Sequence, residues 1–219
     1  MRLTRALGIA AASVAVLAGV LAYVTLGAFL PWRETAEAER LARIAGVGAG
    51  QTVAEIGAGT GRFSVVMARL VGPRGKVFST ELSADKLDAI RERAEAENLE
   101  NLVVVEAGER ETRLPDACCD LVFMRNVYHH VSDPEAFAVS VRRAVRSGGR
   151  LAVMDFEPGA LWFLGGRPAD TSEPRTGHGV SRAQALAEFT AAGFRLERED
   201  SRWSGPMWLM LFSTAQPER

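Results

Sequence analysis

From residue 51 onward the chain alternates short apolar runs with longer amphipathic segments, and this alternation limits its fold more than any other feature. Short runs rich in Val, Leu and Phe predict strands, whereas apolar residues three and four positions apart predict helices. The predicted strands cover residues 52–56, 76–82, 101–107, 119–127, 149–156, 194–201 and 206–214, and the predicted helices cover residues 62–70, 83–99, 133–145 and 181–194. Such alternation predicts an α/β fold, with a mostly parallel seven-stranded sheet and helices on both faces.

The composition agrees with one globular domain and argues against nucleic acid as a partner. The chain has 219 residues, of which 47% are hydrophobic and 24% are charged, so it can bury one sizeable core. Its formal net charge is −1, and its basic residues form no stripe along the sequence. Domains that bind nucleic acid usually carry such a basic patch.

The amino-terminal region is apolar enough to cross a membrane. No charged residue occurs between Arg5 and Arg33, and this span is long enough to cross about 30 Å of hydrocarbon as one helix. We therefore expect an anchor in residues 1–32 that contacts the membrane through residues 6–30. A cleaved export signal and a buried core helix are the alternatives. Positive charges flank both ends of the span, so they do not fix its orientation.

Residues 33–50 connect this span to the alternating region. Apolar residues at Leu41, Ile44 and Val47 predict a linker helix that ends near Gly46 to Gly50. The folded domain is then expected to cover residues 51–219.

The two cysteines are neighbours, Cys118 and Cys119, in a run that reads as a buried strand. We expect them to be reduced, small apolar residues, because a bond between adjacent cysteines closes a strained ring. A metal site formed with His129 or His130 is the alternative, but the spacing matches no zinc pattern, so we expect no metal.

Three glycines at alternate positions follow the first predicted strand, in the segment VAEIGAGTGRFS. Glycines there allow a tight turn and let the backbone approach a ligand closely, and the next helix offers free N–H groups. The dinucleotide fingerprint G-x-G-x-x-G would need glycine where Arg62 stands, and no Gly-Lys-Ser/Thr follows as in a phosphate-binding P-loop. The pattern is instead E-x-G-x-G-x-G, from Glu55 to Gly61.

This pattern resembles the nucleotide-binding motif of class I S-adenosylmethionine-dependent methyltransferases, in particular those of small molecules such as ubiquinone and menaquinone precursors. Further segments follow in the family's order: KVFSTEL, VVVEAGERE, LPDACCDLVFMRNVYHHVSDP, RRAVRSGGRLAVMDFEP and AEFTAAGFRLERE. The resemblance covers roughly residues 34–215. It implies a Rossmann-like fold and S-adenosylmethionine as cofactor.

The resemblance also implies the residues that bind this cofactor. Glu81 matches the acidic residue that accepts hydrogen bonds from the ribose hydroxyls, and Glu109 matches the position that holds the adenine amino group. Glu55 is left for the aminoacyl ammonium, because a phosphate-free cofactor needs carboxylates rather than a cationic pocket. The complete set of expected cofactor-binding residues is Glu55, Gly57, Gly59, Gly61, Glu81, Glu109, Arg125 and Asn126.

The loop after the fourth predicted strand is where we expect acceptor chemistry. Tyr128 or His130 is expected to face the acceptor as a catalytic group, while a packing role is the alternative for each. His178 lies in a segment that resembles a flap over the pocket. Trp162, Phe163 and Leu164 either line an apolar acceptor site or cover the sheet edge.

These features predict methyl transfer to a small hydrophobic acceptor, such as a lipid or quinone-like molecule. The alternatives are a catalytically silent, membrane-tethered module that binds S-adenosylmethionine and, less favoured by Arg62, an NAD-dependent oxidoreductase. Because the cofactor is kept in the cytosol, we expect a single-pass membrane protein with its domain there. An exported domain is the alternative.

Overall fold

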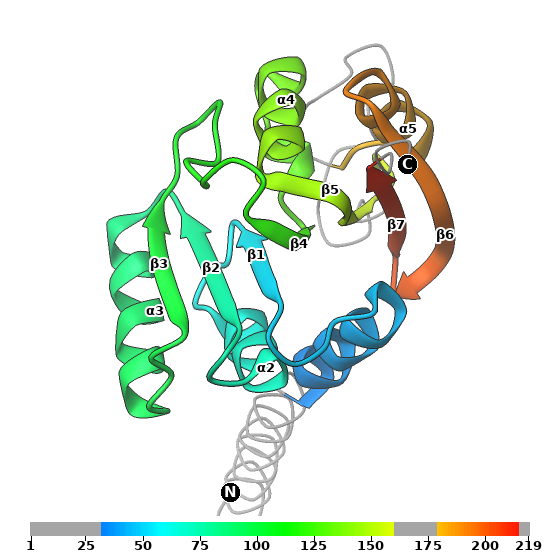
Figure 1. Ribbon diagram of the computed structural model, residues 1–219. Helices are drawn as coiled ribbons and strands as arrows, with labels where there is room; N and C mark the ends of the chain where they lie inside the picture. Colours follow the sequence, from blue (N-terminus) through cyan, green and yellow to red (C-terminus); the bar gives the residue numbers. More distant parts are fainter. Residues whose placement is uncertain (1–31, 160–178, 215–219) are drawn as a thin grey trace, which may run out of the picture.

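The computed structural model describes residues 32–159 and 179–214, which form a seven-stranded sheet with helices on both faces (Figure 1). The expected anchor over residues 6–30 lies outside these residues, as do Trp162, Phe163, Leu164 and His178. Within the described ranges, no helix is both long and apolar enough to span a bilayer.

The sheet has the strand order β3-β2-β1-β4-β5-β7-β6. Strands β1 to β5 pair in parallel with one another, whereas β7 runs antiparallel to both β5 and β6. The bounds are β1 Thr52–Ile56, β2 Lys76–Glu81, β3 Leu102–Glu106, β4 Cys119–Arg125, β5 Val145–Phe156, β6 Phe194–Ser204 and β7 Met207–Thr214. The predicted mostly parallel, seven-stranded α/β fold is therefore confirmed.

Two of the helices, α4 and α5, begin at residues whose side chains cap them. Asp133 accepts a hydrogen bond from the backbone N–H of Ala136 (3.1 Å) at the start of α4, and Ser181 accepts one from Gln184 (3.2 Å) at the start of α5. The bounds are α2 Arg62–Val71, α3 Ala84–Ala96, α4 Pro134–Ala144, α5 Arg182–Ala191 and the short 3-10 helix η1 Tyr128–His130.

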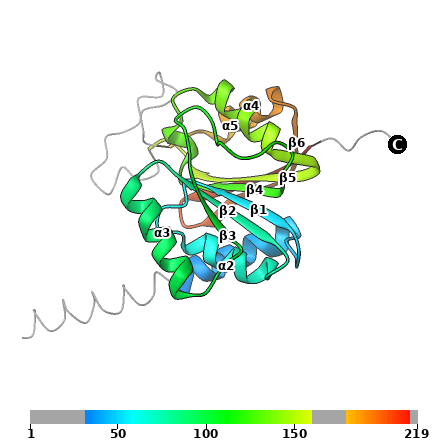
Figure 2. The same ribbon diagram turned by 60° about the vertical axis from the view of Figure 1, so that its left-hand side comes forward.

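Two layers of buried side chains enclose the sheet, one on each face. Successive strand residues point to opposite faces, so Val53 packs on the side of α2 while Ala54 packs on the side of α4 and α5. Figure 2 shows α4 and α5 on one side of the sheet and α2 on the other. Because both faces are covered, the ligand-accessible region of the parallel sheet is the end of its strands.

The segment predicted as a linker helix is part of the core. Residues 32–45 are helical, and Ala38, Leu41, Ala42 and Ala45 are buried in the same cluster as α2 and β7. Small Ala residues between the larger apolar ones let this helix lie close to the sheet. The structure therefore extends the folded domain to include this helix, ahead of residue 51.

The expectation of two reduced cysteines is contradicted, because the structure pairs Cys118 with Cys119 in a disulfide. Side chains of neighbouring strand residues point to opposite faces, which would keep the two sulfur atoms apart. β4 begins at Cys119, the predicted start of this strand, whereas Cys118 lies between it and a turn in which Ala117 has a positive φ of 50°. That turn lets the two side chains point toward each other.

Candidate functional site

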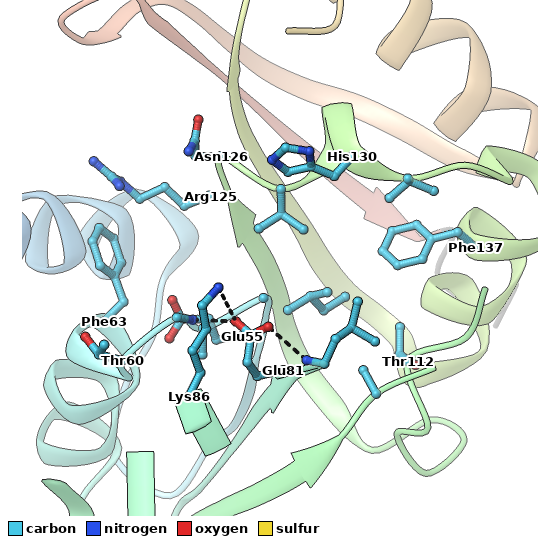
Figure 3. Close-up of a pocket in the computed structure, with 18 of the residues that line it drawn as sticks. Glu55, Thr60, Phe63, Glu81, Lys86, Thr112, Arg125, Asn126, His130 and Phe137 are labelled. Atoms are coloured by element: carbon cyan, nitrogen blue, oxygen red, sulfur yellow. Dashed lines mark hydrogen bonds and ion pairs between the residues drawn. The ribbon is translucent and has the colours of Figure 1, made fainter. Parts of the chain in front are cut away.

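A pocket of about 550 Å³ lies at the carboxyl ends of β1, β2 and β4. Strand order reverses between β1 and β4, since β2 and β3 lie on one side of β1 while β4 and β5 lie on the other. Chain connections leave in opposite directions at this point and open a crevice, which is where doubly wound sheets bind ligands. Figure 3 shows the side chains that line it.

The three glycines of the loop after β1 have positive φ angles, and each has a different surrounding. A Cβ on Gly57 would approach Val127 to 2.5 Å, and one on Gly61 would contact Ile90 of α3 at 3.2 Å. A Cβ on Gly59 would meet no atom within 4 Å. Gly57 and Gly59 line the pocket, whereas Gly61 does not and instead allows α3 to pack closely against the loop.

Glu81, the last residue of β2, holds the glycine loop in place. Its Oε2 accepts a hydrogen bond from the backbone N–H of Gly59 (2.9 Å), and its Oε1 accepts one from Leu82 (2.8 Å). The Lys86 ammonium lies 3.7 Å from Oε2 (Figure 3). Glu81 therefore presents a buried, firmly oriented carboxylate to the pocket.

Glu55 lies in β1 and is 4% exposed. The Ser64 hydroxyl lies 2.5 Å from its Oε2 and 2.8 Å from the hydroxyl of Ser79. Burial raises the pKa of the Glu55 carboxyl to about 8, although the Ser64 hydrogen bonds and the charge of Arg125 act in the opposite direction. In the absence of a further cation, Glu55 is mainly protonated at neutral pH.

The remaining residues predicted to bind the cofactor also line this pocket. Glu109 lies at an exposed position beyond β3, and Arg125 and Asn126 lie at the end of β4. Asn126 adopts a positive φ of 58°, which Asn tolerates better than most residues, and its N–H donates to the carbonyl of Met154 (2.8 Å). Among the eight predicted residues, Gly61 alone is not a lining residue.

His130 is the predicted catalytic group that the structure places at the pocket, opposite Glu81 in Figure 3. Burial and the neighbouring His129 lower the pKa of its imidazole from the usual 6.5, so the ring is neutral at pH 7. His129 itself is buried, with its Nδ1 2.8 Å from Asp155 Oδ1, while its backbone N–H donates to Asp155 Oδ2 (3.1 Å). Asp155 therefore fixes the turn that carries His130.

Tyr128 is placed in the core rather than at the pocket. Its side chain is fully buried, with the ring centroid 4.6 Å from that of Phe189, and its hydroxyl donates to Glu188 of α5 (2.5 Å). The 3-10 turn of η1 directs Tyr128 toward α5 and leaves His130 at the pocket. This arrangement does not support the predicted acceptor-facing role of Tyr128.

The sequence did not point to Glu37, Lys86 or Asp155. Glu37 lies far from Arg125 in sequence, yet both nitrogens Nε and Nη2 of that guanidinium donate to its carboxylate (3.1 Å each). Asp155 could have been identified from the sequence, since it is a single carboxylate in an otherwise apolar predicted strand. In residues 32–159 and 179–214, no group of three or more His, Cys, Asp or Glu residues is suited to holding a metal ion.

Comparison with known proteins gives a family match for the central part of the chain. Residues 54–153 match the family described as a methyltransferase domain. The ubiquinone/menaquinone biosynthesis C-methyltransferase of Hahella chejuensis is 33% identical over 112 residues, which cover 51% of this chain and 45% of that protein. The chain thus matches less than half the length of this curated relative.

Solved structures share the fold at low sequence identity. An S-adenosylmethionine-dependent methyltransferase from Aquifex aeolicus has a TM-score of 0.66 at 22% identity, over 80% of this chain and 88% of that one. The geranyl diphosphate C-methyltransferase of Streptomyces coelicolor, solved with Mg²⁺, geranyl diphosphate and S-adenosylhomocysteine, has a TM-score of 0.67 at 16% identity, over 83% and 81%.

Proposed function

Since residues 54–153 match a methyltransferase domain, we propose that this chain transfers a methyl group from S-adenosylmethionine to a small, hydrophobic acceptor. The observation that carries the proposal is the pocket itself. Glu55, Glu81 and Glu109 are three of the carboxylates that line it, and they lie around a glycine loop whose central residue faces open space. A phosphate-free nucleoside with an amino-acid tail needs acceptors of this kind at three separate places.

Each polar group of this cofactor has a suitable partner among the described residues. Glu81 is held by two backbone N–H groups, so its carboxylate is ready to accept hydrogen bonds from the ribose hydroxyls. Glu55 is buried with a raised pKa and would become ionised beside the aminoacyl ammonium. Glu109 lies in the loop that follows β3 and is assigned to the adenine amino group. The open space at Gly59 leaves the backbone accessible to the ligand.

The acceptor side of the pocket is formed by His130, Val131 and Phe137. The bound cofactor supplies an activated methyl group on its sulfonium, so the chain has to align an acceptor and, for oxygen or carbon acceptors, remove a proton. His130 is neutral at pH 7 and is fixed through the Asp155 contacts of the adjacent residue, which suits it to accept that proton. Apolar neighbours favour a hydrophobic acceptor.

A lipid or quinone-like acceptor agrees with the named relatives, one of which acts in ubiquinone and menaquinone biosynthesis. It also agrees with the charge-free residues 6–30, which we propose as a single-pass anchor. Glu34, four residues beyond that span, lines the pocket, so the anchor would hold the pocket close to the membrane surface. The cytosolic origin of the cofactor supports a cytosolic domain.

Mass spectrometry tests the activity directly. The purified chain is incubated with membrane lipid extract and S-adenosylmethionine carrying a deuterated methyl group, and products are searched for the corresponding mass increase. A labelled lipid or quinone supports the proposal. Tight cofactor binding without any labelled product would instead favour the silent binding module.

Topology needs a separate measurement. A reporter enzyme that is active only after export is fused beyond Arg219, and its activity is compared with that of a fusion carrying a known export signal. We expect no reporter activity. Strong activity would place the domain outside the cytosol and contradict this part of the proposal.

A further inference from the structure

One side of the pocket carries a cation whose orientation is fixed by the amino-terminal helix. The Arg125 guanidinium lies 5.3 Å from the ring of Phe63, and the two side chains are neighbours in Figure 3. Its Nε and Nη2 donate to the two oxygens of Glu37 at 3.1 Å each. The bidentate hydrogen bonds to Glu37 and the contact with the Phe63 ring together hold the guanidinium in one orientation.

Glu37 is itself held in place, because its carboxylate also accepts a hydrogen bond from a second donor. The indole N–H of Trp203 donates to Glu37 Oε1 at 2.7 Å, so the same oxygen receives two hydrogen bonds. Glu37 is 7% exposed at its side chain, whereas Arg125 is 27% exposed and lines the pocket. In the described part of the chain no hydrogen-bond partner is found for Arg125 Nη1, which leaves donor capacity for a ligand.

The other cations of the pocket are less suited to bind a carboxylate tightly. Lys86 pairs with Glu81, and Arg62 lies 3.4 Å from Glu34. Their side chains are 53% and 42% exposed, so solvent screens them more than Arg125. Arg125 is also the cation whose charge acts on Glu55.

Glu55 and Arg125 therefore form one end of the pocket. The carboxyl of Glu55 suits a cationic group of a ligand, and the guanidinium of Arg125 suits an anionic group. An amino acid carries an ammonium and a carboxylate on the same carbon, and this pair of side chains matches both. We propose that Arg125 binds the α-carboxylate of the methionyl part of the cofactor, and that Glu37 is a positioning residue that holds Arg125 for this contact. The inference rests on the proposed function, assigns Arg125 a specific contact with the cofactor and adds Glu37 to the site.

Decarboxylated S-adenosylmethionine provides the test, since it lacks only the group that Arg125 is proposed to bind. Binding of both ligands is measured by calorimetry on the full chain in detergent, for the wild type and for Arg125→Gln, Glu37→Gln and Arg40→Gln. Arg40 lies on the same helix and contacts Asp200 and Trp203, but it does not line the pocket, so it serves as the matched control. Thermal unfolding identifies variants that fail to fold.

We expect Arg125→Gln to weaken S-adenosylmethionine at least tenfold and to leave the decarboxylated ligand unchanged or tighter. Glu37→Gln should reduce the same preference by a smaller factor, and Arg40→Gln should leave it intact. Equal losses for both ligands would mean that Glu37 and Arg125 only support the fold, and the inference would be overturned. If the wild type binds neither ligand, the proposed function fails instead.

Discussion

Glu55→Gln is expected to change how the stability of the domain depends on pH. The folded-state pKa of Glu55 is about 8, against 4.5 for the ordinary group, so at intermediate pH the folded chain holds a proton that the unfolded chain has lost. A raised pKa contributes stability that is fully present below 4.5 and is lost as pH rises through 8. The free energy of unfolding should therefore fall with rising pH by about 1.4 kcal/mol per unit, or roughly 2 kcal/mol between pH 6.5 and 8.

This window avoids the other shifted groups. The pKa of His130 is lowered, so the stability that it contributes is present above pH 6.5 and is lost only as pH falls further. Its effect on the free energy of unfolding therefore changes with pH in the opposite direction to that of Glu55. Contacts with Arg150 hold the pKa of Glu197 below its ordinary value, and hydrogen bonds to Glu157 and Glu199 raise the pKa of Arg182, so both pKa values lie outside the window. Gln keeps the size of Glu55 but does not titrate, so the substitution removes only the pH dependence that Glu55 contributes to the free energy of unfolding.

Denaturant unfolding of the full chain at pH 6.5, 7, 7.5 and 8 gives the required free energies. The free energy of unfolding of the wild type, relative to that of Glu55→Gln, should fall by roughly 2 kcal/mol as pH rises across the series. Glu106→Gln, at an exposed site in β3, two strands from β1, should follow the wild type. A constant difference between wild type and Glu55→Gln would show that Glu55 is ionised when buried and would refute the reasoning.

Three further substitutions test the pocket. Gly59→Val places a side chain in the cofactor space and should weaken binding of S-adenosylmethionine more than tenfold by calorimetry, whereas Gly205→Val, at a nearly equal φ of 58° with equally open surroundings outside the pocket, should bind normally. Glu81→Gln should also weaken the cofactor about tenfold or more, since charge-assisted hydrogen bonds contribute about 1.5–3 kcal/mol; an affinity equal to that of Glu106→Gln would limit Glu81 to a turn role. His130→Ala should lower kcat with the acceptor identified by labelling and leave cofactor affinity unchanged, and a kcat equal to that of the wild type would remove His130 from the mechanism.

Local patterns were sufficient to predict the sheet and the glycine loop. The apolar runs and the Gly57 to Gly61 spacing are properties of neighbouring residues, so strand and helix positions follow from them. β5 nevertheless starts at Val145, four residues before its predicted start, because the chain after α4 pairs directly with Cys119. Such a pairing depends on a distant strand and leaves no local signal.

The arrangement of charges could not be predicted for the same reason. Glu37 has two partners, Arg125 and Trp203, that lie 88 and 166 positions away, and nothing near Glu37 indicates either. Tyr128 and His130 are two residues apart in one loop, yet the turn of η1 sends one into the core and the other to the pocket. The sequence identified both as candidates but did not contain the turn geometry that separates them.

The contacts of the helix over residues 32–45 also determine the order in which this domain can fold. This helix comes first among the described residues, but its partner Trp203 belongs to β6, near the other end of the chain. Contacts between such distant residues form late, because closing a long loop costs entropy before the contact can repay it. Glu37 can therefore complete its contacts only once the β6 and β7 hairpin has joined the sheet. Until then the carboxylate that orients Arg125 lacks one of its two partners, so the pocket is complete only when both ends of the domain are in place.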